Sequence, residues 1–213
     1  MASADTPKLW NFSAGPAILP LSVCERAAEA VRELRADGHA PGAPGVGMSI
    51  LEISHRSKPY EAVTFGAEKL CHEVLGIPES HQVLFLQGGA SLQFAMLAMN
   101  LREAGKPAAY VDTGVWSQKA IAESQGLGET TVVASSAETN YDRIPAFPAA
   151  ASYAGASYLH ITTNNTIFGT EYAEIPAAQG GVPLVIDFSS HAGSRPMALE
   201  RAALGYAGAQ KNL

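Results

Sequence analysis

The sequence predicts an α/β protein with a mostly parallel sheet and helices on both faces. Short apolar runs typical of buried strands alternate with longer segments whose apolar residues recur at helical spacing. Four of the predicted strands end in polar residues at their carboxyl sides, where open α/β sheets bind their ligands. With 213 residues, the chain is long enough for one well-buried domain of this class.

Composition and charge exclude several classes of function. Fourteen basic and 20 acidic side chains give a formal net charge of −6 without a basic cluster, so nucleic acid and anionic membranes are poor candidate partners. No apolar run approaches the roughly 18 residues of a membrane span, and no secretory signal is visible. Cys24 and Cys71 lie in helix-like segments, which favours reduced packing residues in a cytoplasmic protein over a disulfide.

The first third of the chain is predicted to hold an extended arm and two helices. Residues 1–20 form the Pro-punctuated arm, and residues 21–213 form the domain itself. Helical spacing predicts one helix over 22–37 and another over 59–75, with a loop rich in glycine and proline at 39–47 between them. Apolar residues recur at helical spacing in the first helix at Val23, Ala27, Ala30, Val31 and Leu34, and the second helix is expected to turn Val63, Gly66, Ala67, Leu70 and Val74 inward.

Strands and helices alternate along the rest of the chain. Buried strands are predicted at 83–86, 108–111, 157–162 and 183–186, a polar-edged strand at 130–134 and a short apolar run at 204–209. Helices are predicted over 92–102 and 116–126, and a short one at 148–153 within a long loop.

Two residues at the ends of predicted strands suggest pyridoxal-phosphate chemistry. Asp187 ends the run 183–186, and Lys211 follows the run 204–209. A lysine can hold the cofactor aldehyde as a Schiff base, and a carboxylate can keep the pyridine nitrogen protonated so that the ring takes up electrons. On these two residues alone, an aspartate that caps a turn and a solvated lysine explain the pattern equally well.

A glycine turn suggests an anion site. Gln-Gly-Gly-Ala-Ser at 87–91 joins a predicted strand to a predicted helix, where bare amides and the positive end of the helix favour an anion. The pattern is only moderately specific, because a plain tight turn has the same composition.

Three further positions carry weaker signals. His55 and Arg56 are adjacent, and a guanidinium with a second donor suits a carboxylate or phosphate, although most such pairs are solvated surface. Trp116 stands at a strand-to-helix junction, where it could also simply pack on the loop. Thr166 is a plausible hydrogen-bond donor, whereas Asn164 and Asn165 are typical of a turn.

Six segments, in this order, resemble the phosphoserine aminotransferases, fold-type I pyridoxal-phosphate enzymes of the class V aminotransferase group. They are Asn-Phe-Ser-Ala-Gly-Pro-Ala at 11–17, Glu-Ile-Ser-His-Arg-Ser at 52–57, Gln-Gly-Gly-Ala-Ser at 87–91, Val-Asp-Thr-Gly-Val-Trp at 111–116, Asn-Asn-Thr-Ile-Phe-Gly-Thr-Glu at 164–171, and Asp-Phe-Ser-Ser, Ser-Arg-Pro and Ala-Gly-Ala-Gln-Lys-Asn within 187–212. The chain departs from the family at Ser57, where glycine is common, and at Ala14, where serine is frequent. Neither departure alters the residues of the anion sites.

The resemblance implies roles for the candidate residues. Lys211 would carry pyridoxal 5′-phosphate and shuttle a proton, and Asp187 would hold the electron sink ready. Trp116 would stack on the pyridine ring, and His55 and Arg56 would hold the acidic end of a substrate in the partner subunit's site. No metal site is predicted. The implied cofactor-binding residues are Ala90, Ser91, Trp116, Thr166, Asp187, Gln210 and Lys211.

The reaction that the resemblance implies moves the amino group of glutamate to a phosphorylated 2-oxo acid, 3-phosphohydroxypyruvate, in serine biosynthesis. Family members act as homodimers with shared active sites. They continue past the lysine into the rest of the large domain and a smaller C-terminal domain, whereas this chain ends at Leu213. We therefore expect the C-terminal part to be missing, with weakened cofactor affinity and little or no transamination.

Two alternatives remain open at this point. One is another class V enzyme, such as a serine– or alanine–glyoxylate aminotransferase, against which the His55-Arg56 pair argues. The other is a truncated cofactor-binding domain that folds without catalysing the reaction.

Overall fold

The structure, a computed structural model, describes residues 10–36 and 42–213, so parts of the predicted arm, first helix and glycine-rich loop lie outside the described residues. The chain divides between Leu70 and Cys71 into two compact units, which are described separately. Within the described ranges, no helix has the length and apolar character needed to cross a membrane.

The first unit contains α1, Leu21–Arg32, which ends five residues before the predicted boundary. The backbone of Glu33 is extended, and Leu34 N–H donates to the Met48 carbonyl at 2.8 Å, so the chain leaves the helix to pair with the segment that follows. Ala30 and Leu34 are buried, but Val23 and Val31 are 45% and 47% exposed. The apolar positions of this helix are therefore only partly buried among the described residues.

The second predicted helix is α2, Lys58–Leu75, which spans the division between the units. None of its residues is buried, and Leu70 and Val74 are mostly exposed, so the apolar stripe is not covered by the described residues. Neither cysteine forms a disulfide within the described residues, but Cys24 is exposed and is not the packing residue that was expected.

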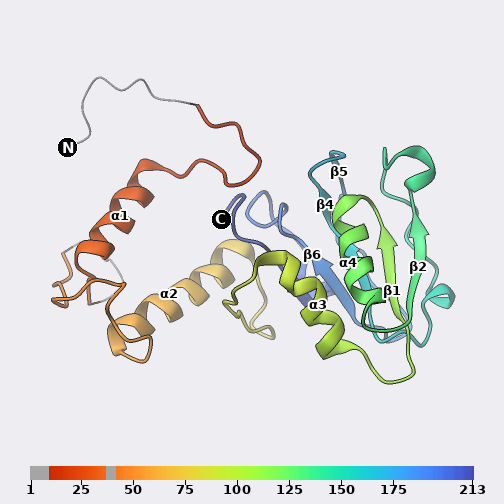
Figure 1. Ribbon diagram of the computed structural model, residues 1–213, viewed down its shortest axis with the longest axis horizontal. Helices are drawn as coiled ribbons and strands as arrows, with labels where there is room; N and C mark the ends of the chain where they lie inside the picture. Colours follow the sequence, from red (N-terminus) through yellow and green to blue (C-terminus); the bar gives the residue numbers. More distant parts are fainter. Residues whose placement is uncertain (1–9, 37–41) are drawn as a thin grey trace. The chain divides into compact units, whose positions relative to one another are not determined.

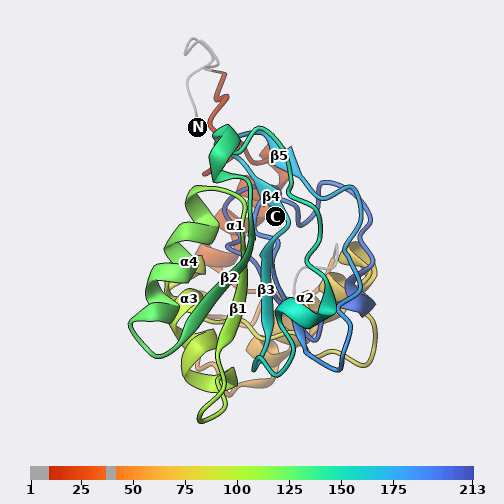
Figure 2. The same cartoon turned by 90° about the vertical axis from the view of Figure 1, so that its right-hand side faces the viewer.

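The second unit is built on a parallel sheet, which confirms the α/β class (Figures 1 and 2). Its strands pair in the order β2-β1-β3-β6-β7, and every pair is parallel. The strands are β1 (Ala108–Asp112), β2 (Thr130–Ser135), β3 (Leu159–Thr162), β6 (Leu184–Asp187) and β7 (Leu204–Tyr206). The α-helices are α3 (Gly89–Leu101) and α4 (Val115–Gln125).

The predicted strand at 83–86 is absent. Leu84, Phe85 and Leu86 are 56–72% exposed and form no strand. A strand needs a hydrogen-bonded neighbour, and no described residue pairs with this segment, so its apolar composition alone does not make it a strand.

Alternation of side chains along the strands divides the core into two layers. The register aligns Tyr110 with His160, Thr162 with Asp187, and Asp187 with Tyr206, so these side chains share one face of the sheet. Helices α3 and α4 cover this face (Figure 2), where Phe94, Leu97, Ala120 and Ile121 complete a buried cluster.

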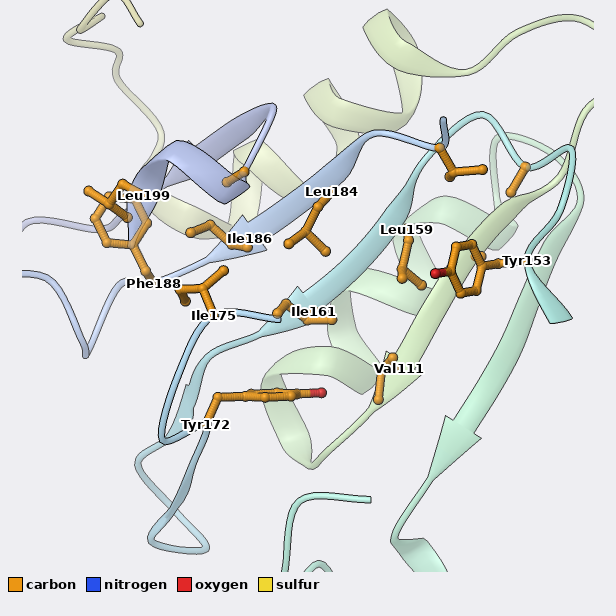
Figure 3. Close-up of a cluster of buried hydrophobic side chains, with 14 of the residues drawn as sticks. Val111, Tyr153, Leu159, Ile161, Tyr172, Ile175, Leu184, Ile186, Phe188 and Leu199 are labelled. Atoms are coloured by element: carbon orange, nitrogen blue, oxygen red, sulfur yellow. The ribbon is translucent and has the colours of Figure 1, made fainter. Parts of the chain in front are cut away.

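The opposite face carries the intervening residues, including Val111, Leu159, Ile161, Leu184 and Ile186 (Figure 3). The side chains that cover them come from loops and short 3₁₀ turns, among them η2 (Ala150–Ser152) and η3 (Leu199–Arg201). The sequence predicts helices on both faces, and within this unit the α-helices α3 and α4 account for one of them.

A small hairpin follows β3. Strands β4 (Asn164–Asn165) and β5 (Thr170–Glu171) pair antiparallel, with Gly169 N–H donating to the Asn165 carbonyl at 2.8 Å. Asn164 and Asn165 therefore lie in a strand, and the turn they support presents Thr166.

Candidate functional site

Three predicted cofactor residues from distant parts of the chain meet beyond the carboxyl ends of the strands. Trp116 lies in the first turn of α4, Thr166 in the hairpin turn and Lys211 after β7. Trp116 Nε1 donates to Thr166 Oγ1 at 3.2 Å, and Lys211 Nζ donates to the same oxygen at 2.9 Å. Nζ also lies 5.8 Å from the centroid of the Trp116 ring. The fold thus assembles an amine, a hydroxyl and an aromatic surface at one place.

Asp187 ends β6 and is buried, with 4% of its surface exposed. Its Oδ1 accepts hydrogen bonds from Ser189 N–H at 3.0 Å and Ser189 Oγ at 2.7 Å. Burial raises the pKa of this carboxyl, while Ser189, the Tyr206 hydroxyl and the charge of Lys211 act in the opposite direction. A carboxylate held by donors in a dry environment suits a partner that carries a proton.

The Lys211 amine is partly buried, and its environment makes loss of its proton easier than in water. Burial lowers the pKa of Lys211, and the negative charge of Asp187 only partly offsets this effect. The neutral amine is the nucleophilic form, so this lysine is suited to attack a carbonyl carbon.

The glycine turn before α3 has the geometry of an anion cradle. Gly88 and Gly89 have φ angles of +93° and +59°, left-handed values that few other residues adopt, and α3 begins at Gly89. Ala90 and Ser91 therefore lie in the first turn, with the early amides and the positive end of the helix at this edge. The helix begins three residues before its predicted start, which places both predicted phosphate ligands within it.

The segment before Lys211 lies beside this helix start. A Cβ added to Gly208 would come within 3.7 Å of Ala90 N and 2.8 Å of Gln210 Oε1. Gly208 N–H also donates to Ser189 Oγ at 3.0 Å, so the hydroxyl that holds Asp187 also anchors the lysine loop. The predicted phosphate residues and the lysine are thereby joined to one site.

His55 and Arg56 belong to the first unit, in the turns before α2, and both are exposed. Arg56 N–H donates to Ser54 Oγ at 3.2 Å, which fixes the local turn. Their proposed contact with a substrate remains a prediction.

Asp112 organises the start of α4. It lies in the matched segment 111–116, but the sequence alone indicated no role for it. It is buried, and its carboxylate accepts from Ser117 Oγ at 2.9 Å and from the Tyr141 hydroxyl at 2.8 Å. These bonds fix the turn that carries Trp116. The sequence signal for Asp112 was its position directly after an apolar run, the same signal that identified Asp187.

His160 and Tyr206 were also missed. His160 is fully buried, and its Nε2 lies 2.9 Å from the Tyr206 hydroxyl on the same sheet face as Asp187. The signal was a histidine between two apolar residues of a predicted strand, Leu159 and Ile161. Among the described residues, no group of three or more His, Cys, Asp and Glu side chains is arranged to hold a metal ion.

Known proteins resemble this chain over nearly its whole length. It is 49% identical to the phosphoserine aminotransferase of Geobacillus kaustophilus and 47% identical to that of Bacillus subtilis, over 97% and 95% of this chain. A phosphoserine aminotransferase solved in a study of radiation damage to its Schiff base superposes with a TM-score of 0.85 at 44% identity, over 98% of this chain and 55% of that one. The pyridoxal-phosphate-bound enzyme from Trichomonas vaginalis superposes with a TM-score of 0.79 at 34% identity, over 96% of this chain and 55% of that one.

The match with the two curated relatives covers only 54% and 53% of their sequences, so the chain spans about half their length. Residues 9–213 match the family described as aminotransferase class-V, and this range includes the glycine turn, the hairpin, Asp187 and Lys211. With its fold confirmed by the superpositions, the chain belongs to the class-V aminotransferases.

Proposed function

We propose that this chain is the cofactor-binding part of an aminotransferase that uses pyridoxal 5′-phosphate to move an amino group between glutamate and 3-phosphohydroxypyruvate. The observation that carries the proposal is the meeting of Lys211, Thr166 and Trp116 beside the buried carboxylate of Asp187. The names of the relatives support the choice of substrates.

The residues present fit this cofactor. An aldehyde requires a lysine whose neutral form is accessible, a pyridine nitrogen requires a carboxylate, and a phosphate requires free amides at a helix start. Lys211, Asp187 and the turn at 88–91 meet these requirements in turn. When bound, pyridoxal phosphate supplies an electron sink for the charge that develops on the substrate carbon.

Each side chain then has a definite task. Lys211 would hold the cofactor and, when free of it, would accept and return a proton at Nζ. Asp187 would keep a proton on the ring nitrogen, and Trp116 would offer a flat face that excludes water. Thr166 would donate a hydrogen bond near the ring, and the Ala90 amide, Ser91 and Gln210 would bind the phosphate.

We further propose that His55 and Arg56 bind the acidic end of a substrate in the partner subunit's site of a cytoplasmic homodimer. A planar guanidinium can hold a carboxylate or phosphate through two hydrogen bonds. The exposed position of both side chains leaves them accessible for such a contact. Both proposed substrates carry a suitable anion: glutamate has a side-chain carboxylate, and phosphoserine has a phosphate.

Borohydride reduction of the protein loaded with pyridoxal phosphate tests the central assignment. The expected result is a pyridoxyl group on Lys211, located by peptide mass spectrometry. Lys119 is a matched control, because its Nζ lies 4.6 Å from the centroid of the same Trp116 ring. Labelling should persist in Lys119→Ala and disappear in Lys211→Ala. A label confined to Lys119 or Lys106 would overturn the assignment.

The choice of substrate is tested on the loaded protein by absorbance. Glutamate and phosphoserine should each change the absorption band of the bound cofactor, whereas alanine should not. A response to alanine but not to phosphoserine would instead favour a glyoxylate-type aminotransferase.

A further inference from the structure

A chain of three buried polar side chains runs behind the proposed cofactor site. Asp187 and Tyr206 are aligned partners on β6 and β7, and His160 lies on the same face of β3, on the other side of β6. The Tyr206 hydroxyl lies close to the Asp187 carboxylate, and this interaction acts to lower the pKa of Asp187 and to raise that of Tyr206. The same hydroxyl lies 2.9 Å from His160 Nε2. The order of contacts is therefore carboxylate, phenol and imidazole.

His160 ends this hydrogen-bond chain, because its other ring nitrogen has no partner among the described residues. The side chain is fully buried, its ring stacks on Tyr110 with centroids 4.8 Å apart, and Nδ1 makes no hydrogen bond. The Tyr110 hydroxyl instead pairs with the Tyr158 hydroxyl at 2.8 Å. Burial lowers the pKa of His160 to about 3, so the imidazole is neutral and carries a single N–H.

The charge on Asp187 sets the direction of this hydrogen-bond chain. An ionised Asp187 can only accept, so Tyr206 donates to it and His160 donates to Tyr206 Oη from a proton on Nε2. In the reverse direction a protonated Asp187 would donate to Tyr206, Tyr206 would donate to Nε2, and the imidazole proton would lie on Nδ1. Nδ1 has no partner among the described residues in either arrangement, so the position of the imidazole proton reports the ionisation state of Asp187.

We propose that Tyr206 and His160 are positioning residues that hold Asp187 as a hydrogen-bond acceptor, so that its carboxylate is ionised and oriented for the pyridine nitrogen. The role in cofactor binding rests on the proposed function. The direction of the hydrogen bonds from His160 through Tyr206 to Asp187 is a property of the protein alone. Burial raises the pKa of Asp187, and the hydrogen bonds from Ser189 and the positive charge of Lys211 act against burial in favour of the ionised state. His160 thus acts on the cofactor only through Tyr206 and Asp187 and does not contact it directly.

The tautomer of His160 is the first test, and it needs neither cofactor nor turnover. Histidine-selective ¹³C and ¹⁵N labelling gives one set of ring signals for each of the six histidines, and the set lost in His160→Gln belongs to His160. The expected spectrum shows the neutral tautomer with the proton on Nε2, unchanged between about pH 5 and pH 8. A proton on Nδ1, or a charged ring in this range, would overturn the proposal.

Affinity for pyridoxal phosphate is the second test. Tyr206→Phe removes the central hydroxyl and should raise the dissociation constant roughly tenfold, the value expected for one buried hydrogen bond to a charged group. Tyr158→Phe is the matched control, since it removes a buried hydroxyl from the same core without touching Asp187 or His160. Equal losses in the two variants would indicate a merely structural role and refute the inference.

Replacement of His160 separates donation from packing. His160→Gln provides an amide N–H that can donate to Tyr206, so affinity should stay within about threefold of the parent, whereas His160→Leu should match Tyr206→Phe. Equal affinities for the Gln and Leu variants would contradict the need for a donor. If the parent itself binds no pyridoxal phosphate, the proposed function fails, while the tautomer of His160 still decides the direction of the chain.

Discussion

Acid should destabilise this protein through His160. The imidazole is fully buried, and burial lowers its pKa from 6.5 to about 3. A base with a depressed pKa in the folded state must release its proton on folding. Its contribution to stability is therefore present above pH 6.5 and is lost as the pH falls from 6.5 towards 3.

The magnitude follows from the two pKa values. At pH 5 the unfolded chain holds the proton almost completely and the folded chain hardly at all, which costs about 2 kcal/mol relative to pH 7. Other groups also respond in this range. The lowered pKa of His191 acts in the same direction, and the raised pKa of Asp187 acts in the opposite one. The informative quantity is therefore the difference between the parent and His160→Gln.

Urea unfolding at pH 7 and pH 5, followed by far-ultraviolet circular dichroism, measures this difference. The parent should lose about 2 kcal/mol more than His160→Gln over this interval. Tyr158→Phe, which keeps the imidazole, should lose as much as the parent. Equal losses in the parent and His160→Gln would show that His160 is not buried as a neutral group, and the reasoning would fail.

Four further outcomes follow from the site. Asp187→Asn should weaken binding of pyridoxal phosphate by roughly tenfold or more, because a buried hydrogen bond to a charged group is lost; a titration with unchanged affinity would contradict the role of this carboxylate. Thr166→Val should also weaken that binding, since Trp116 N–H and the lysine amine lose their common acceptor, whereas Thr166→Ser should not; equal affinities of the two variants would count against the hydroxyl. Ser117→Ala should lower the free energy of unfolding by about 1 kcal/mol through the lost bond to Asp112, as measured by urea unfolding. Sedimentation should show a homodimer or larger assembly, and a stable monomer would argue against shared active sites.

The sequence predicts those elements whose stability comes from their own pattern and a nearby partner. β1 and α4 were predicted nearly to the residue, because a continuous apolar run and an inward pair, Ala120 and Ile121, are sufficient signals. The run 83–86 is as continuously apolar as the run 108–111 of β1 but has no paired neighbour among the described residues, and no local pattern distinguishes the two cases. α1 ended early for a similar reason, since the segment after it pairs with a loop rather than continuing the helix.

The site was predicted unevenly for the same physical reason. Asp187 and Lys211 stand at the ends of apolar runs, so their position in a parallel sheet follows from topology. The hairpin that presents Thr166 has strands of two residues, which are too short to show alternation. The direction of the chain from His160 to Asp187 depends on which residues are aligned across strands, and alignment becomes visible only in the folded structure.

Because successive residues of β6 point to opposite faces, natural variation in chain length at this strand is tightly constrained. Deleting one residue between Leu184 and Ile186 would turn Asp187 towards the apolar cluster of Figure 3 and bring an apolar side chain to the proposed cofactor site. The preceding loop around Gly180 and Gly181 carries no such constraint, since both lie outside the sheet. Across related genes, insertions and deletions should therefore accumulate in that loop, while the number of codons from Leu184 to Asp187 stays fixed.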